Sequence, residues 1–228
     1  MKKPIKVRLE SLTPFEPITD KQSKVVSEYK SGNSLVLSGS PGTGKTFIAL
    51  SLALEDVLDK NNQYEKVVIV RSIVPTRDIG FLPGDEDEKK DAYTAPYRSI
   101  LSEICSNDSE AYVKLIDSGE LEFMSTSFIR GITINNAIIV VDEFQNCNGH
   151  ELDSIITRMG RNCKLIICGD YYQSDFTKDN DKKSVVKFLE IIKQLNRFSY
   201  IEFTWQDIVR SGIVRDYIMT KEMLKITF

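Results

Sequence analysis

Short apolar runs of strand length, rich in β-branched residues, recur along the chain. The six runs cover residues 35–37, 67–70, 121–124, 137–141, 165–168 and 200–203. Longer segments with helical character lie between most of them, at residues 45–59, 88–104, 108–117, 150–159 and 182–195. Strands that alternate with helices predict βαβ units, in which helices cover both faces of a mostly parallel sheet. The pattern therefore indicates the α/β class.

The length and composition of the chain fit one domain with a substantial core. The chain has 228 residues, of which 41% are hydrophobic and 28% charged, an ordinary globular balance. It contains no internal repeat or low-complexity tract, and we expect a single domain over residues 1–228. Residues 75–90 are the least regular stretch, and their charge pattern alone is typical of a solvated surface loop.

Charge, cysteine usage and the N-terminus exclude several classes of protein. The net charge of −3 means that the chain lacks the overall positive charge typical of small nucleic-acid-binding domains. None of the four cysteines forms a C-x-x-C pair and His150 is the only histidine, so we expect no zinc site. Residues 1–10 lack the apolar centre of a secretory signal, and no stretch approaches the roughly 18 apolar residues of a membrane span. We expect a cytoplasmic protein with reduced thiols and no membrane partner.

A phosphate-binding motif lies between the first apolar run and the first helical segment. Residues 39–46 match the P-loop pattern G-x-x-x-x-G-K-[ST] in full. Glycines let the backbone N–H groups turn toward phosphate oxygens, and the helix N-terminus adds partial positive charge. Lys45 is expected to reach the β- and γ-phosphates, and the Thr46 hydroxyl to ligate Mg²⁺. The predicted nucleotide-binding residues of this motif are Ser40, Pro41, Gly42, Thr43, Gly44, Lys45 and Thr46.

An acidic pair follows the most apolar run of the chain. Residues 138–143 read Ile-Ile-Val-Val-Asp-Glu, which is typical of a Walker B motif. Asp142 is predicted to hold the magnesium, directly or through water, and Glu143 to orient or deprotonate the attacking water. Alone, such a pair is more often the start of a loop. Its position downstream of a complete P-loop favours the catalytic interpretation, and the glutamate favours a hydrolase over a nucleotide kinase.

A third polar motif, Gly-Asp-Tyr-Tyr-Gln at residues 169–173, also comes directly after an apolar run. A simple turn is an equally good interpretation of Gly-Asp at a strand end. Gln173 is nevertheless placed to sense the γ-phosphate. Because the carboxyl ends of parallel strands form the ligand crevice, the three motifs are expected to converge on one site.

Several longer pieces of the sequence resemble one family. They are residues 80–85, 129–131, 142–146, 157–160, 169–173 and 207–210. In this order they resemble the PhoH-like ATPases, whose core is similar to that of superfamily 1 helicases. The resemblance runs from about Thr19 to Tyr217 and implies a RecA-like P-loop NTPase fold.

The resemblance implies roles for individual residues. Thr19 and Gln22 look like the segment that reads adenine, so ATP would be preferred; a solvated helix position is the alternative for Gln22. Gln145 resembles the coupling glutamine of the helicases. Arg210 resembles an arginine that stabilises charge on the transferred phosphoryl group, and Arg158 is a second candidate for that role. A surface salt bridge is the alternative for Arg210.

Three further arginines match family positions that contact partners, and two positions of the chain differ from the family pattern. Arg71, Arg77 and Arg130 sit where the relatives touch nucleic acid or a neighbouring subunit. Ile132 stands where the family usually has another arginine, and Ser211-Gly212 stands where it commonly has His-Pro. These departures leave the ATP site unchanged but weaken the expected nucleic-acid contacts. Residues 75–85 are expected either to bind nucleic acid or to pack on a neighbouring subunit.

The leading hypothesis is Mg²⁺-dependent ATP hydrolysis coupled to RNA or single-stranded DNA. Superfamily 1 helicases use two RecA-like domains, whereas this chain has the length and motifs for one. The resemblance therefore implies a homo-oligomer, a ring of six, with the arginine finger supplied by another copy. The alternative is a regulatory switch in which ATP binding controls assembly without motor activity. A small-molecule kinase is disfavoured, because no lid-like basic segment is present.

Overall fold

A six-stranded sheet with the strand order β3-β2-β4-β5-β1-β6 forms the centre of the protein. The computed structural model describes residues 6–72, 86–171, 179–210 and 212–224, with the backbone alone for residues 86–91 and 179–182. The strands are β1 (Ser34–Gly39), β2 (Lys66–Arg71), β3 (Leu121–Ser125), β4 (Ala137–Asp142), β5 (Cys163–Gly169) and β6 (Phe198–Phe203). Every neighbouring pair is parallel. All six apolar runs therefore form strands, and the predicted α/β class is confirmed.

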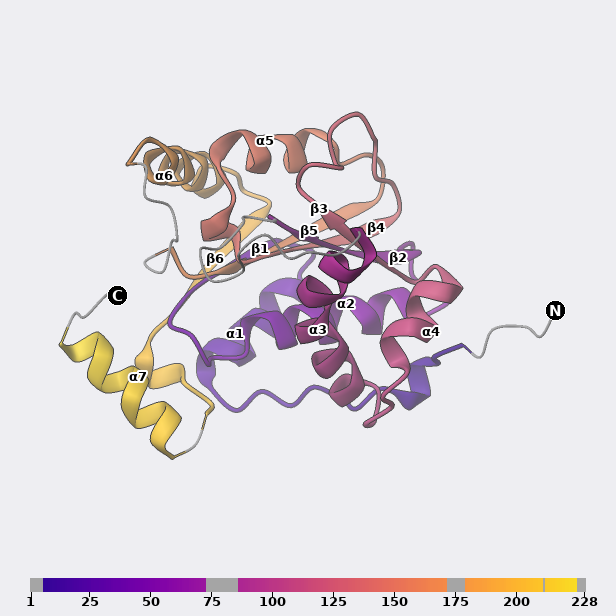
Figure 1. Ribbon diagram of the computed structural model, residues 1–228, viewed down its shortest axis with the longest axis horizontal. Helices are drawn as coiled ribbons and strands as arrows, with labels where there is room; N and C mark the ends of the chain where they lie inside the picture. The colour runs from indigo at the N-terminus through magenta and orange to yellow at the C-terminus, as the bar shows by residue number, and fades with distance from the viewer. Residues whose placement is uncertain (1–5, 73–85, 172–178, 211, 225–228) are drawn as a thin grey trace.

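Helices cover both faces of the sheet, as predicted (Figure 1). One face carries α1 (Asp20–Lys30), α2 (Lys45–Leu58), α3 (Glu86–Ile104) and α4 (Ala111–Ser118). The other face carries α5 (Gly149–Thr157) and α6 (Asp179–Lys193), and α7 (Ile213–Met223) follows the last strand. Short 3₁₀ helices occur at η1 (Leu9–Ser11), η2 (Phe144–Asn146) and η4 (Trp205–Asp207).

Two apolar layers sandwich the sheet because alternate residues of each strand point to opposite faces. In β4, Ile138 and Val140 pack toward α2 and its neighbours, whereas Ile139 and Val141 pack toward α5 and α6. Every residue of β4 is buried, as expected for a strand covered on both faces. Cys168 of β5 is fully buried among the core residues.

Two helices were not expected from the hydrophobic pattern. In α1, the Thr19 side chain caps the helix by accepting a hydrogen bond from the Gln22 N–H at 3.2 Å. Only the four-residue spacing of Val25 and Tyr29 marks its buried face, which is a weak periodic signal. The fully described helix α7 buries none of its residues, so it lacks the apolar stripe that identifies a helix in sequence.

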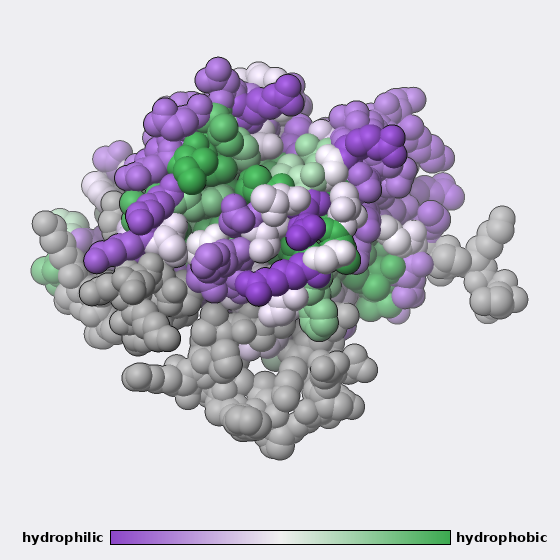
Figure 2. Space-filling view, turned by 90° about the horizontal axis from the view of Figure 1, so that it is seen from above, coloured by the Kyte–Doolittle hydropathy of each residue, from purple (hydrophilic) through white to green (hydrophobic). Residues whose placement is uncertain are grey.

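The surface over α5 and α6 is largely hydrophilic with scattered hydrophobic patches (Figure 2). Among the described residues, no helix has both the length and the apolar character needed to cross a membrane. The features that position a site lie instead at the carboxyl edge of the sheet, where the six parallel strands end.

Candidate nucleotide-binding site

A cavity of about 650 Å³ opens at the carboxyl ends of β1, β4 and β5. The structure thus brings together the P-loop, the acidic pair and the start of the third motif. Their lining residues are Pro41, Gly42, Gly44, Lys45, Thr46, Asp142, Glu143, Gly169 and Asp170. Gln173, the last residue of the third motif, lies outside the described residues.

The P-loop leaves β1 through a position that accepts only glycine. Gly39 has a φ of +115°, and a Cβ there would lie 1.9 Å from the carbonyl oxygen of Phe203. The same carbonyl accepts a hydrogen bond from the Ser40 N–H at 3.1 Å. The turn is closed by the Thr43 hydroxyl, which donates to the Ser40 carbonyl at 3.0 Å. Helix α2 then begins at Lys45, so its N-terminus faces the cavity.

Lys45 lies across the P-loop with its ammonium group at the cavity. Its Nζ donates to the carbonyl oxygens of Gly39 at 2.7 Å and Ser40 at 2.8 Å. Burial lowers the pKa of Lys45, and the negative charge of Asp170 opposes that shift. The cation is therefore held beside backbone carbonyls and carboxylates, within the cavity that the helix N-terminus faces.

Asp142 has a defined partner for each carboxylate oxygen. The Thr46 hydroxyl donates to Oδ1 at 2.7 Å, and the Tyr97 hydroxyl donates to Oδ2 at 2.8 Å. Only 5% of Asp142 is exposed, whereas Thr46 and Asp142 both line the cavity. Burial and the Asp142 charge hold the pKa of Tyr97 well above its usual range, so the phenol stays protonated and donates.

Glu143 adopts a backbone conformation that is unusual for a residue with a side chain. Its φ is 52° and its ψ is 47°, the left-handed region, which costs energy and is enriched at functional sites. The turn directs Glu143 into the cavity directly after β4. Burial and the adjacent charge of Asp142 raise the pKa of the Glu143 carboxyl, which makes the carboxylate a stronger base.

Gln145 connects the ends of two strands. Its Nε2 donates to Glu143, and its Oε1 accepts from the backbone N–H of Asp170 at 2.9 Å. Only 4% of Gln145 is exposed. The site therefore contains a direct link between the residue after β4 and the residue after β5, at the position where the resemblance implied a coupling glutamine.

The cavity also has an apolar compartment next to α1. Phe15 and Phe47 both line it, with ring centroids 6.2 Å apart. Gln22 is 2% exposed, so the interpretation of this residue as a solvated helix position is wrong. Its Oε1 accepts from the Ile18 N–H at 2.8 Å, and its Nε2 donates to the Thr43 carbonyl at 3.2 Å. Thr19 caps α1 and is not among the residues that line the cavity.

Arg210 lies at the P-loop of its own chain. The backbone N–H of Val209 donates to the Gly42 carbonyl at 3.0 Å, which fixes this segment on the loop. A Cβ on Gly42 would lie 3.1 Å from Cγ of Arg210, and Arg210 lines the cavity. The chain therefore places Arg210 beside its own P-loop.

Of the other candidate arginines, the three that the structure describes do not line the cavity. Arg158 caps the C-terminal end of α5 and Arg130 is exposed after β3; neither is among the lining residues. Arg71, at the end of β2, is opposite Asp142 in the strand register. Burial alone would lower the pKa of Arg71, but Tyr97 and Asp142 raise it overall. Arg77 and residues 75–85 lie outside the described residues.

The match to a family model covers nearly the whole chain. The model for the PhoH-like protein matches residues 14–222, which include the P-loop, the acidic pair and Arg210. The chain belongs to the PhoH-like protein family.

Curated relatives carry the same family name. The chain is 31% identical to a PhoH-like protein of Bacillus subtilis over 198 residues, which covers 86% of this chain and 60% of the relative. It is 30% identical to a PhoH-like protein of Synechocystis over 206 residues, which covers 90% of this chain and 61% of the relative. The chain thus spans about three fifths of the length of these relatives.

Helicases are among the solved structures to which the chain is similar. The helicase domain of Pyrococcus furiosus Hef has a TM-score of 0.47 and 13% identity, over 79% of this chain and 38% of that one. Bacteroides Pif1 bound to single-stranded DNA has a TM-score of 0.45 and 15% identity, over 92% of this chain and 49% of that one. Likeness at this level assigns no role to any residue of the present chain.

The sequence did not reveal two features of the site. Phe15 and Phe47 contribute the aromatic wall, but neither stands in a recognisable motif. Tyr97 touches the acidic pair from α3, where it shares a buried face with Leu101 and Ile104. That helical spacing predicts a core residue, and nothing in it indicates that the tyrosine hydroxyl reaches Asp142.

Proposed function

We propose that this chain binds ATP with Mg²⁺ and hydrolyses the bond between the β- and γ-phosphates. The observation that carries the proposal is the 2.7 Å hydrogen bond between Thr46 and Asp142, formed where α2 begins and next to Glu143. Family membership supports nucleotide binding by the P-loop. The residues proposed to bind phosphate, hold the metal and activate water all line one cavity, which supports the proposal.

The oxygen atoms of Thr46 and Asp142 fit a magnesium ion. Mg²⁺ takes hard oxygen ligands and usually keeps only one or two protein ligands beside substrate phosphates and water. The two side chains meet at the cavity wall and supply a hydroxyl and a carboxylate. When bound, the ion would neutralise charge that develops on the phosphate oxygens.

In the proposed reaction, Glu143 accepts a proton from water as the water oxygen bonds to the γ-phosphorus. The bond from that phosphorus to the β–γ bridging oxygen breaks, and ADP leaves with the electron pair. Lys45 and the N–H groups of the P-loop hold the phosphates, and Arg210 stabilises the transferred group from its own chain. The left-handed turn at Glu143 keeps its carboxylate in the cavity.

The apolar compartment is the proposed base site, with ATP as the preferred nucleotide. Phe15 and Phe47 offer a wall for a flat ring system. The Gln22 amide retains a second N–H and a second lone pair beyond its two described bonds. That donor–acceptor pair suits the adenine edge.

Coupling to RNA or single-stranded DNA is the proposed use of the ATP cycle. The support is the order of helicase-like motifs and the Gln145 link between Glu143 and Asp170. Arg130 is an exposed cation on a loop that follows β3 at the carboxyl edge. Salt-dependent binding to a single strand in the presence of nucleotide is expected, because cations contribute most of such affinity.

Self-association into a ring of six remains part of the proposal, although Arg210 already lies at its own P-loop. The resemblance to the family supports it. Sedimentation in the presence of ATP and Mg²⁺ tests this self-association. We expect an assembly that forms as the protein concentration rises. A monomer at every concentration would contradict this part of the proposal alone.

The test of the enzymatic proposal is phosphate release by the intact protein and by Glu143→Gln, with and without single strands. Loss of the base is expected to lower turnover by about 10²- to 10⁴-fold. Glu122→Gln is a matched control, because Glu122 pairs with Lys66 outside the cavity.

The effect of single strands on turnover separates the two candidate functions. Stimulation by a strand supports nucleic-acid coupling, whereas turnover unaffected by strands favours the regulatory switch. An intact protein that binds ATP without turnover contradicts the proposal.

A further inference from the structure

Tyr97 is a fully buried side chain at the edge of the candidate magnesium site. It belongs to α3, its exposed fraction is 0%, and its ring packs against Phe123 with centroids 5.8 Å apart. Its hydroxyl donates to Oδ2 of Asp142 at 2.8 Å. Core packing fixes the ring, so the hydroxyl can meet the carboxylate from only one direction.

A cation lies beside this pair. Arg71 and Asp142 are opposite each other in the register of β2 and β4. The positive charge of Arg71 acts against the rise that burial and Asp142 cause in the pKa of Tyr97. A tyrosine hydroxyl, the carboxylate that accepts its proton and a guanidinium group therefore lie close together at the ends of these two strands.

We infer that Tyr97 is a positioning residue of the magnesium site, which holds Oδ2 of Asp142 so that Oδ1 faces the Thr46 hydroxyl. This inference rests on the proposed function. If the Thr46 hydroxyl turns to the metal, the hydrogen bond between Thr46 and Oδ1 of Asp142 is lost. The hydrogen bond from Tyr97 to Oδ2 then still holds the Asp142 carboxylate. Groups that orient a metal ligand in this way typically contribute 10- to 100-fold to metal affinity.

The test is a Mg²⁺ titration of nucleotide binding, read by a fluorescent ATP analogue that cannot be hydrolysed. Tyr97→Phe removes one oxygen and keeps the packed ring. The Mg²⁺ concentration at half-maximal binding is expected to rise by about tenfold or more. Binding of the analogue in EDTA is expected to stay unchanged, because Tyr97 does not line the nucleotide cavity.

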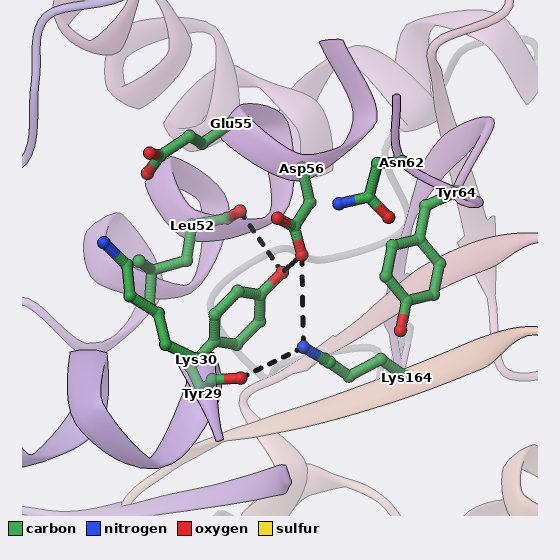
Figure 3. A pocket seen from close by; sticks show the side chains of 8 residues that line it. All are labelled: Tyr29, Lys30, Leu52, Glu55, Asp56, Asn62, Tyr64 and Lys164. Atoms are coloured by element: carbon green, nitrogen blue, oxygen red, sulfur yellow. Dashed lines mark hydrogen bonds and ion pairs between the residues drawn. The ribbon is translucent and has the colours of Figure 1, made fainter. Parts of the chain in front are cut away.

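Tyr29→Phe is the matched control for loss of a buried tyrosine hydroxyl. Tyr29 is 3% exposed, and its hydroxyl donates to Oδ2 of Asp56 at 2.6 Å (Figure 3). Lys164 completes that cluster, which surrounds a pocket of about 310 Å³ separate from the nucleotide cavity. Tyr29→Phe therefore removes a comparable tyrosine–carboxylate bond and is expected to leave the Mg²⁺ titration unchanged.

A spectroscopic measurement covers the case in which Tyr97→Phe folds poorly. Site-specific 3-fluorotyrosine keeps the hydroxyl, and its ¹⁹F resonance at position 97 is expected to shift when Mg²⁺ joins the nucleotide complex. The same probe at position 29 should not shift. A silent probe at position 97, or a Mg²⁺ requirement of Tyr97→Phe equal to that of the intact protein, overturns the inference alone. Absence of Mg²⁺-dependent nucleotide binding by the intact protein overturns the proposed function as well.

Discussion

The carboxamide oxygen of Gln145 accepts a hydrogen bond from the backbone N–H of Asp170 at 2.9 Å. Its nitrogen donates to the carboxylate of Glu143. A single buried side chain thus connects the residue that follows β4 with the residue that follows β5. A buried hydrogen-bonded network is costly to leave partly unsatisfied. A shift of either strand end is therefore expected to move the carboxylate of Glu143, the proposed general base.

Gln145→Ala is expected to slow hydrolysis more than it weakens nucleotide binding. The change leaves Glu143 without its amide donor and removes the acceptor of the Asp170 N–H. A loss of about 10- to 100-fold in turnover is expected, since a hydrogen bond to a charged group contributes about 1.5–3 kcal/mol. Turnover and nucleotide affinity are measured together, with the exposed Gln194→Ala as control. Equal losses in both quantities would contradict a coupling role.

Gly169→Ala is expected to reproduce the kinetic effect of Gln145→Ala. An added Cβ would lie 2.2 Å from Oε1 of Gln145 and 2.7 Å from Cδ1 of Phe144. Because Phe144 is fully buried, the amide of Gln145 must give way, and stability should fall by about 1–3 kcal/mol as in other overpacked cores. In Gly119→Ala the added Cβ has no atom within 4 Å, but the φ of +80° strains the alanine, so this variant controls for a loss of stability that does not displace Gln145. Wild-type turnover in Gly169→Ala would show that the position of Gln145 does not matter.

Gln22→Ala is expected to reduce the preference for ATP over GTP. Gln22 lines the cavity beside Phe15, and its amide joins the Ile18 N–H to the Thr43 carbonyl. Loss of the amide removes the proposed donor and acceptor for adenine, so the affinity for ATP should fall by about tenfold. Competition of both nucleotides against one fluorescent analogue measures the ratio. An equal loss for ATP and GTP would indicate that Gln22 supports the P-loop without reading the base.

The free energy of unfolding is expected to fall at alkaline pH because the thiol of Cys105 is buried. Burial, with a smaller contribution from Asp108, raises the pKa of this thiol from 9.0 to about 11. Between pH 9 and 11 the unfolded chain loses this proton while the folded chain keeps it, so the free energy of unfolding decreases with rising pH. Urea unfolding across this window should show a steeper decrease for the intact protein than for Cys105→Ala. Equal slopes would contradict the shift.

The hydrophobic pattern predicted the sheet because its strands are short, apolar and buried on both faces. It also placed the P-loop and the acidic pair at strand ends, where parallel topology brings them together. The pattern failed for α7, because this helix buries none of its residues. Amphipathic periodicity reports burial, so a helix without a buried face leaves little trace in the sequence.

The parts of the site that sequence did not reveal depend on side-chain direction. Tyr97 occupies a core position, and only the three-dimensional packing turns its hydroxyl toward Asp142. The resemblance left open whether Arg210 or Arg158 stabilises the transferred group, and the hydrogen bond from Val209 to Gly42 fixes the segment that carries Arg210 at the P-loop of its own chain. Long-range contacts of this kind follow from how the elements pack, which residue spacing alone does not specify.

Hydrolysis at this cavity is tested most directly by a single-turnover experiment on ATP bound to the protein, in which the reaction starts on addition of Mg²⁺. We expect the intact protein to convert bound ATP to ADP and phosphate, and Glu143→Gln to bind ATP equally well but to retain it uncleaved. Conversion at the same rate in both proteins would remove Glu143 from the reaction. Failure of the intact protein to cleave bound ATP would contradict the assignment of this cavity as a hydrolytic site.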